Sequence, residues 1–144
     1  MKLSSKNFDD NEMLPNKYTC DDESVSPELS WNNFPQDTKS FAFVIEDPDA
    51  PNGTFTHWMA VNIPVNITSI PERNVNIPEG LMIKNTAGKF EYVAPCPPSG
   101  IHHYVFKVFA LKIAKLENVT LENFYQKINP YIIANAKLVG KFSR

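Results

Sequence analysis

The chain has 144 residues, of which 42% are hydrophobic, and a formal net charge of −2 from 14 basic and 16 acidic residues. This length lies within the usual range of one domain and can bury roughly two-thirds of the unfolded surface, so we expect a single domain over residues 1–144. The charges are spread along the chain and form no basic stripe, which argues against a nucleic-acid partner.

The sequence contains no obvious membrane or export signal. No stretch approaches the roughly twenty apolar residues that a membrane span requires, and the first residues lack the apolar core of a secretory signal. We therefore expect a soluble, cytoplasmic protein without stable membrane insertion. In that setting Cys20 and Cys96 are expected first as free thiols, and a disulfide between them is the alternative.

Three apolar runs predict β-strands. Residues 41–45 and 58–63 are short runs that end at proline-containing turns, which is typical of buried strands. Residues 104–111 are rich in aromatic and β-branched side chains, with Lys107 as the single charge, so this strand should lie centrally in a sheet with both faces covered. Short strands with long, turn-rich connections favour an antiparallel sandwich over alternating strand–helix units.

Helical periodicity appears only near the C-terminus. Thr120 is a plausible N-cap for a helix of about two turns, and Pro130 suits the first position of a second short helix over residues 131–134. Residues 137–142 are predicted to form a closing strand, and residues 67–81 a long surface connection. The apolar positions at helical spacing are Leu121, Phe124, Tyr125 and Ile128.

The first chemical motif is a stiff turn that carries two acids. Pro48 follows Asp47 at the end of a predicted strand and fixes the direction of its carboxylate, and Asp49 with Pro51 repeats the arrangement. His57 follows at the start of the next strand. Taken alone, these residues are better explained as ordinary turn chemistry with solvated carboxylates.

The second motif is a proline-rich turn at residues 95–100 that leads into a strand. Successive side chains on a strand point to opposite faces, so His102 and Tyr104 share a face and His103 points the other way. The adjacent histidines cannot easily converge on one ion, which argues against a zinc site. No Gly-x-Ser-x-Gly elbow is present, so a catalytic nucleophile is not expected. His102 as a hydrogen-bonded core residue stays open.

Together the two motifs resemble the signature regions of the phosphatidylethanolamine-binding protein family in its short bacterial and archaeal form. The resemblance rests on Asp-Pro-Asp-Ala-Pro followed by His-Trp, and on Pro-Cys-Pro-Pro-Ser-Gly-Ile-His-x-Tyr. It covers nearly the whole chain. Further similar segments are residues 18–21, 25–31, 39–42, 85–88, 92 and 138–140.

The resemblance implies a mainly β fold, namely a two-sheet antiparallel β-sandwich with Greek-key connections and short helices near the C-terminus. It also implies a small pocket for phosphate-like anions. Carried over by position, the pocket residues are Asp47, Asp49, His57, His102 and Tyr104, with Pro97 and Pro98 at the rim and Tyr92 close by. Because carboxylates repel anions, we expect one aspartate to accept a hydrogen bond from a histidine whose other nitrogen donates to the ligand.

The function that the resemblance implies is non-enzymatic binding of a small phosphorylated or zwitterionic ligand such as phosphorylethanolamine, with no cofactor or metal. It further implies regulation of a protein partner, such as a kinase or protease, through the pocket rim, and it is compatible with a homodimer. Two alternatives stay open. One is a hydrolase or transferase with His102 as general base, and the other is a protein-interaction module with a vestigial pocket.

Three positions depart from the family pattern. His103 stands where the family usually has arginine, Ala94 where it has glycine before the turn, and Asp22 where it has glycine. Because His103 is expected to lie outside the cluster, its replacement should affect a supporting ion pair more than the pocket. Ala94 raises a question of turn geometry, since alanine tolerates positive φ poorly.

Overall fold

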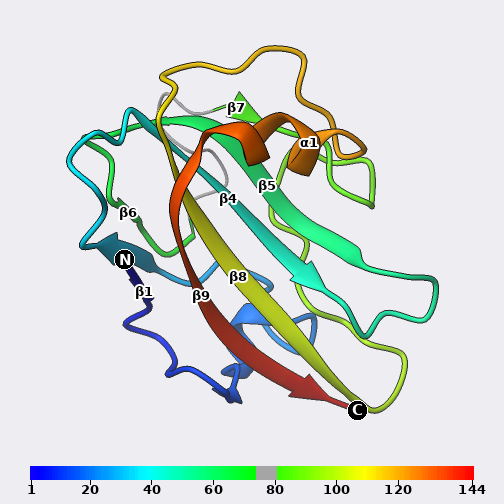
Figure 1. The fold of residues 1–144 in the computed structure, drawn as a ribbon. Coiled ribbons are helices and arrows are strands. Elements are labelled where there is room, and N and C mark those ends of the chain that lie inside the picture. Colours follow the sequence, from blue (N-terminus) through cyan, green and yellow to red (C-terminus); the bar gives the residue numbers. More distant parts are fainter. Residues whose placement is uncertain (74–80) are drawn as a thin grey trace.

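The computed structural model describes residues 1–73 and 81–144 and consists mainly of β-strands (Figure 1). Within these residues, a short 3-10 helix, η1, spans Asn16–Tyr18. The helix α1 at Phe124–Ile128 is followed directly by a second 3-10 helix, η2, at Asn129–Tyr131. The strands are β1 (Lys2–Ser4), β2 (Glu12–Met13), β3 (Leu29–Asn32), β4 (Ser40–Asp47), β5 (Phe55–Pro64), β6 (Ser69–Ile70), β7 (Leu81–Met82), β8 (Ile101–Leu111) and β9 (Ile132–Ser143).

These strands form two sheets, which confirms the predicted mainly β, two-sheet fold. The larger sheet has the order β2-β9-β8-β4-β5-β7, and the smaller one has the order β1-β3-β6. Pairing is antiparallel except between β2 and β9. The apolar runs at residues 41–45, 58–63 and 104–111 lie in β4, β5 and β8, and β8 lies between β4 and β9, so its predicted central position is confirmed.

The main core lies between the two sheets. Trp31 of the small sheet packs edge-on against Phe41 of β4, with ring centroids 5.5 Å apart. Trp58 packs in the same way against Phe43, at 4.9 Å. These aromatic side chains are buried, and large buried rings of this kind supply much of the hydrophobic free energy of a small domain.

The other face of the large sheet is covered by the C-terminal helical turn. Phe124 and Ile128 of α1 are buried, and Phe124 packs against Phe109 of β8. The helix begins at Phe124 and not directly after Thr120; Thr120 instead exchanges hydrogen bonds with Asn123 in the preceding turn. The predicted closing strand at residues 137–142 lies in β9.

The predicted second helix over residues 131–134 is wrong. Pro130 lies in η2, which ends at Tyr131, and the strand β9 starts at Ile132. There Ile132 pairs with Leu111 and Ala134 with Ala110 on β8. The β-branched pair Ile132 and Ile133 suits an extended backbone, and hydrogen bonding to β8 outweighs the local helical signal of the proline.

The predicted connection at residues 67–81 lies partly outside the described residues, which stop at 73 and resume at 81. Its described part contains β6, which pairs with β3 in the small sheet. None of the helices in the described part of the chain is long and apolar enough to cross a membrane.

Cys20 and Cys96 form a disulfide with a Cα–Cα distance of 5.4 Å, so the expectation of free thiols is wrong. The backbone N–H of Cys20 also donates to the carbonyl of Pro95, at 3.1 Å. The expectation rested on the presumed cellular compartment, whereas the fold brings two segments 76 residues apart in sequence into contact. The disulfide therefore fastens the proline-rich turn to the N-terminal segment.

Candidate functional site

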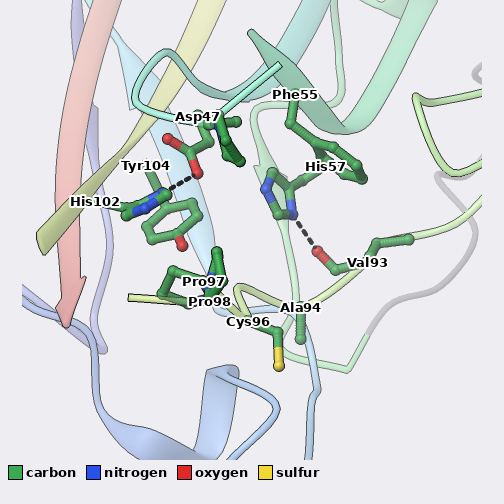
Figure 2. Close-up of a pocket in the computed structure, with 12 residues that line it drawn as sticks. Asp47, Phe55, His57, Val93, Ala94, Cys96, Pro97, Pro98, His102 and Tyr104 are labelled. Carbon is green, nitrogen blue, oxygen red and sulfur yellow. Dashed lines mark hydrogen bonds and ion pairs between the residues drawn. The ribbon is translucent and has the colours of Figure 1, made fainter. Parts of the chain in front are cut away.

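A cavity of about 250 Å³ lies at the end of the large sheet where β4 ends and β5 and β8 begin (Figure 2). In the sheet register, Asp47 at the end of β4 pairs with Phe55 at the start of β5. The first residues of β8 lie on the other side of β4, where Glu46 pairs with Val105. The polar side chains in the cavity wall are those of Asp47, His57, His102 and Tyr104.

A buried hydrogen bond joins Asp47 and His102. The ring N–H at Nδ1 of His102 donates to Oδ2 of Asp47 at 2.6 Å, and the two side chains are 8% and 5% exposed. The other carboxylate oxygen of Asp47 accepts the backbone N–H of Asp49 at 2.8 Å, which closes the turn at Pro48. With the proton at Nδ1, the atom of His102 left for a ligand is Nε2.

His57 is held from the opposite wall. Its Nδ1–H donates to the backbone carbonyl of Val93 at 2.7 Å. The side chain of Asn85 supports this arrangement by donating to the carbonyl of His57 at 3.0 Å and to that of Glu91 at 2.8 Å. Burial lowers the pKa of His57 below its usual value, and this outweighs the opposing effects of the Val93 carbonyl and the Asp47 carboxylate.

Tyr104 lies between the two imidazoles. Its ring is edge-on to His57, with centroids 5.3 Å apart, and nearly parallel to His102, with centroids 6.4 Å apart. Burial, followed by the negative charges of Asp47 and Asp49, raises the pKa of the phenol above its usual value. Tyr104 therefore stays protonated at neutral pH and can donate a hydrogen bond.

The rest of the cavity wall is apolar. Pro97 and Pro98, which the resemblance places at the rim, line the cavity from the proline-rich turn; Pro97 is buried and Pro98 exposed. Cys96 of the same turn also lines the cavity while bonded to Cys20. Ala94 is not at a positive φ, so the alanine causes no strain in this turn. The wall residues that the sequence reasoning missed are Ala50, Pro51, Phe55, Val93, Ala94 and Cys96.

For two of these residues, Phe55 and Val93, the sequence carries different amounts of information. Phe55 precedes His57 by two positions on the same strand and packs against it, with ring centroids 4.7 Å apart. Strand alternation could therefore have identified it. Val93 acts through its backbone carbonyl, for which the side-chain pattern carries no signal.

The structure places two of the predicted site residues outside the cavity wall. Asp49 is exposed because its N–H closes the turn onto Asp47, which directs its side chain outward to His103. Its Oδ2 accepts both the ring Nδ1–H of His103 at 2.7 Å and the backbone N–H of that residue at 2.8 Å. The side-chain bond, followed by the backbone bond, lowers the pKa of Asp49 below its usual value. His103 is exposed on the outer face, which confirms its predicted orientation.

Tyr92 lies behind the wall. Its hydroxyl donates to the carbonyl of Tyr18 at 2.7 Å, and its ring packs against Trp58. Burial raises the pKa of this phenol. Tyr92 therefore stabilises the loop that carries Val93 and does not reach the cavity.

The arrangement can hold a small ligand by hydrogen bonds with two imidazoles and one phenol, and with the Asp47 carboxylate beside them, in an otherwise apolar cavity. Within residues 1–73 and 81–144, no three histidine, cysteine or acidic side chains converge as a metal site. The volume lies just below the roughly 300–1,000 Å³ typical of pockets for drug-sized molecules. The geometry therefore suits a ligand of a few atoms or the head of a larger one.

Comparison with known proteins gives consistent results. A family model described as phosphatidylethanolamine-binding protein matches residues 4–143. A UPF0098 protein of Aquifex aeolicus is 39% identical over 152 residues, covering 100% of this chain and 89% of that protein. A UPF0098 protein of Methanothermobacter thermautotrophicus is 38% identical over 151 residues, covering 100% of this chain and 99% of that protein.

Two solved structures are similar along almost the full length. A phosphatidylethanolamine-binding protein homolog from Chlamydia trachomatis has a TM-score of 0.91 and 33% identity, covering 99% of this chain and 97% of that chain. Escherichia coli YbcL, described as a new member of the mammalian family, has a TM-score of 0.92 and 30% identity, covering 99% and 98%. The fold, the matched family model and these relatives together show that the chain belongs to the phosphatidylethanolamine-binding protein family, in its bacterial and archaeal form.

Proposed function

We propose that this protein binds a small phosphate-type oxyanion, or the phosphorylated head of a larger molecule, in the cavity around Asp47, His57, His102 and Tyr104, and releases it unchanged. The observation that carries the proposal is the buried hydrogen bond from His102 Nδ1–H to Asp47. This bond orients the ring, and Nε2–H of a protonated ring can then donate to a ligand oxygen. The positive charge would be compensated by the carboxylate on the far side of the ring.

Preorganisation supports the same proposal. The prolines at positions 48, 51, 97 and 98 restrict the two loops of the cavity, and the disulfide at Cys96 fastens one of them. A wall that is ordered before binding reduces the conformational entropy lost on binding. The phenol of Tyr104 supplies a neutral donor that does not depend on pH in the physiological range.

A binding function fits the wall better than catalysis by a protein nucleophile. In the described part of the chain, the one sulfur of the cavity wall is that of Cys96, and it is bonded to Cys20. The oriented pair of Asp47 and His102 could still activate a water molecule as general base. The experiment below therefore monitors turnover as well as binding.

Regulation of a protein partner would be a consequence of the same site. Pro98 is exposed at the cavity rim, and the neighbouring Ile101 is 62% exposed. A partner that contacts this rim would compete with the ligand or respond to it. Competition between a phosphorylated ligand and a kinase or protease for the rim is the form of regulation that we propose.

Phosphorus NMR of phosphorylethanolamine tests the proposal. We expect saturable broadening or shift of the ligand signal with the wild-type protein and no new phosphorus signal over time. His102→Ala should abolish binding, whereas His103→Ala, which changes the adjacent histidine on the outer face, should leave it unchanged. Accumulation of free phosphate would show a hydrolase, and wild-type affinity in His102→Ala would show that the assigned cavity is wrong.

A further inference from the structure

The charge of the cavity wall is unusual for an anion site. Among the residues that the structure describes, Asp47 is the one acidic residue of the wall, and no lysine or arginine side chain lines it. Arg144 is near enough to act on Tyr104, but its guanidinium is paired with Asp21. A doubly charged anion that enters the cavity therefore meets a buried carboxylate and no permanent positive charge. A protonated His102 ring only balances the charge of Asp47, so the charge of the anion itself stays uncompensated in a poorly solvated site, which opposes binding.

The hydrogen bonding of His57 adds to this problem. The Val93 carbonyl can only accept, so it keeps the proton of the neutral imidazole at Nδ1. The other ring nitrogen, Nε2, then carries a lone pair, and Figure 2 shows it on the side of the ring that faces Asp47 and Tyr104. A lone pair repels an unprotonated ligand oxygen. A proton between Nε2 and that oxygen turns this repulsion into a hydrogen bond.

We infer that the cavity takes up its anion together with one proton, which is shared between Nε2 of His57 and a ligand oxygen. The inference rests on the proposed oxyanion binding and specifies its chemistry. The proton can arrive on the ligand or be taken from solvent by the ring, and the complex has the same composition in both cases. Oxyanions that carry a proton near neutral pH, such as phosphate monoesters, are thereby favoured over sulfate esters, which carry none.

The groups around His57 agree with this assignment. Asp47 faces it from β4, and His102 and Tyr104 face it from β8. The loop behind it contributes the Val93 carbonyl and the buried phenol of Tyr92, neither of which is charged. Burial keeps the free ring neutral at pH 7 by lowering its pKa, so protonation of the site is a consequence of binding and does not precede it.

The test compares two ligands that differ in their ability to carry a proton, phosphorylethanolamine and ethanolamine O-sulfate. Calorimetric titration at several pH values gives each affinity. The phosphate ester, with a second pKa of about 6, should lose affinity about tenfold per pH unit above that value and be insensitive to pH just below it. The sulfate ester should bind more weakly at pH 7 and continue to gain affinity as the pH falls through about 6, because its proton must come from solvent.

Proton uptake gives an independent measurement on the wild-type protein. Titrations above about pH 7 in buffers of different ionisation enthalpy should show about one proton taken up per ligand bound. His57→Gln should lower the proton uptake by about one per ligand and reduce the pH dependence of sulfate ester binding. The dependence that remains belongs to His102, whose Nε2 also donates to the ligand only when that ring is protonated. His103→Gln, a matched change on the outer face, should retain the wild-type values.

The possible failures are distinguishable. Binding of both esters without pH dependence or proton uptake would overturn the inference and leave the proposed function intact. An unchanged pH dependence in His57→Gln would show that another group takes the proton, which also contradicts the inference. Absence of binding of either ester at every pH would overturn both the proposed function and the inference.

Discussion

Two aspartate–histidine pairs lie on either side of the same strand end and differ almost entirely in environment. Asp47 and His102 are buried at 2.6 Å beside the cavity, whereas Asp49 and His103 are joined at 2.7 Å with side chains 40% and 47% exposed. In the sequence the two aspartates are two positions apart, and the two histidines are adjacent. The two pairs consist of the same residue types but differ in role, because the turn at Pro48 and the alternation of side chains along β8 direct one pair inward and the other outward.

Removal of the disulfide should give the largest effect on stability. Its local effect should fall on the cavity side of the strand end, where Asp47 and His102 lie, and not on the exposed pair. The double variant Cys20→Ala/Cys96→Ala releases the turn that forms one cavity wall, and loss of such a cross-link typically costs about 2–4 kcal/mol of unfolding free energy. Denaturant unfolding measures this cost. Ligand affinity should fall as well, because the wall is less ordered before binding.

The outer pair provides the internal reference for this variant. The hydrogen bond between Asp49 and His103 does not involve the turn at residues 95–98, so the ring resonances of His103 should keep their positions. Unchanged stability together with unchanged ligand affinity would contradict the assigned role of the disulfide.

Matched substitutions of the two aspartates test the comparison most simply. In Asp47→Asn, a neutral amide replaces the buried carboxylate that accepts N–H groups from His102 and Asp49. Nδ1 of His102 must then give up its proton to accept from the new NH₂ group, and the loss of hydrogen bonds to a charged group should cost about 1.5–3 kcal/mol of unfolding free energy. In Asp49→Asn the exposed pair is lost in water, which should cost less than about 1 kcal/mol. Equal losses measured by denaturant unfolding would show that burial does not separate the two pairs.

The free energy of unfolding should depend on pH in different ranges for the cavity side, through His57, and for the outer face, through Asp49. The pKa of His57 is lowered in the folded state by burial, so the unfolded chain binds this proton more readily. Its contribution to stability is therefore complete above the unfolded value of about 6.5 and is lost as the pH falls through the folded pKa. Unfolding experiments between about pH 7 and 5 should show this loss in the wild-type protein and not in His57→Gln.

The smallest effect is expected at Asp49. Its pKa is lowered by the hydrogen bonds from His103, so its contribution is present above the unfolded value of about 3.9 and is lost as the pH falls through the lower folded value. Because the pair is exposed, solvent screening keeps the contribution small. Carbon-detected NMR titration of the carboxylate should show a lowered pKa in the wild-type protein and a pKa closer to the ordinary value in His103→Ala.

The sequence predicted the parts of the site that depend on strand alternation and proline turns. His102 and Tyr104 share a face and His103 opposes them because β8 is a regular strand. Asp49 was assigned to the cavity together with Asp47, and it lies outside because its N–H closes the turn onto its neighbour. The closure is a local Asx-turn, in which the Asp47 carboxylate accepts the backbone N–H two residues on. The turn chemistry at Pro48 therefore indicated it, but the family resemblance placed both aspartates in the pocket.

Contacts between distant segments were less visible in the sequence. The disulfide between Cys20 and Cys96 and the hydrogen bond from His57 to the Val93 carbonyl both depend on how loops meet at the end of the sheet. The helical signal around Pro130 failed for a related reason, since pairing with β8 governs the backbone from Ile132 onward. Local propensity predicted the elements, and tertiary contacts decided their ends.

The central claim is that an oxyanion binds between His57 and His102 and not on the outer face. The chain has three histidines, so a long-range proton–nitrogen NMR spectrum of the imidazole rings can follow all of them during a titration with phosphorylethanolamine. The account predicts that the ring nitrogens of His57 and His102 shift with a common saturable midpoint while those of His103 stay in place. Shifts confined to His103, or no shift in any ring at saturating ligand, would contradict it.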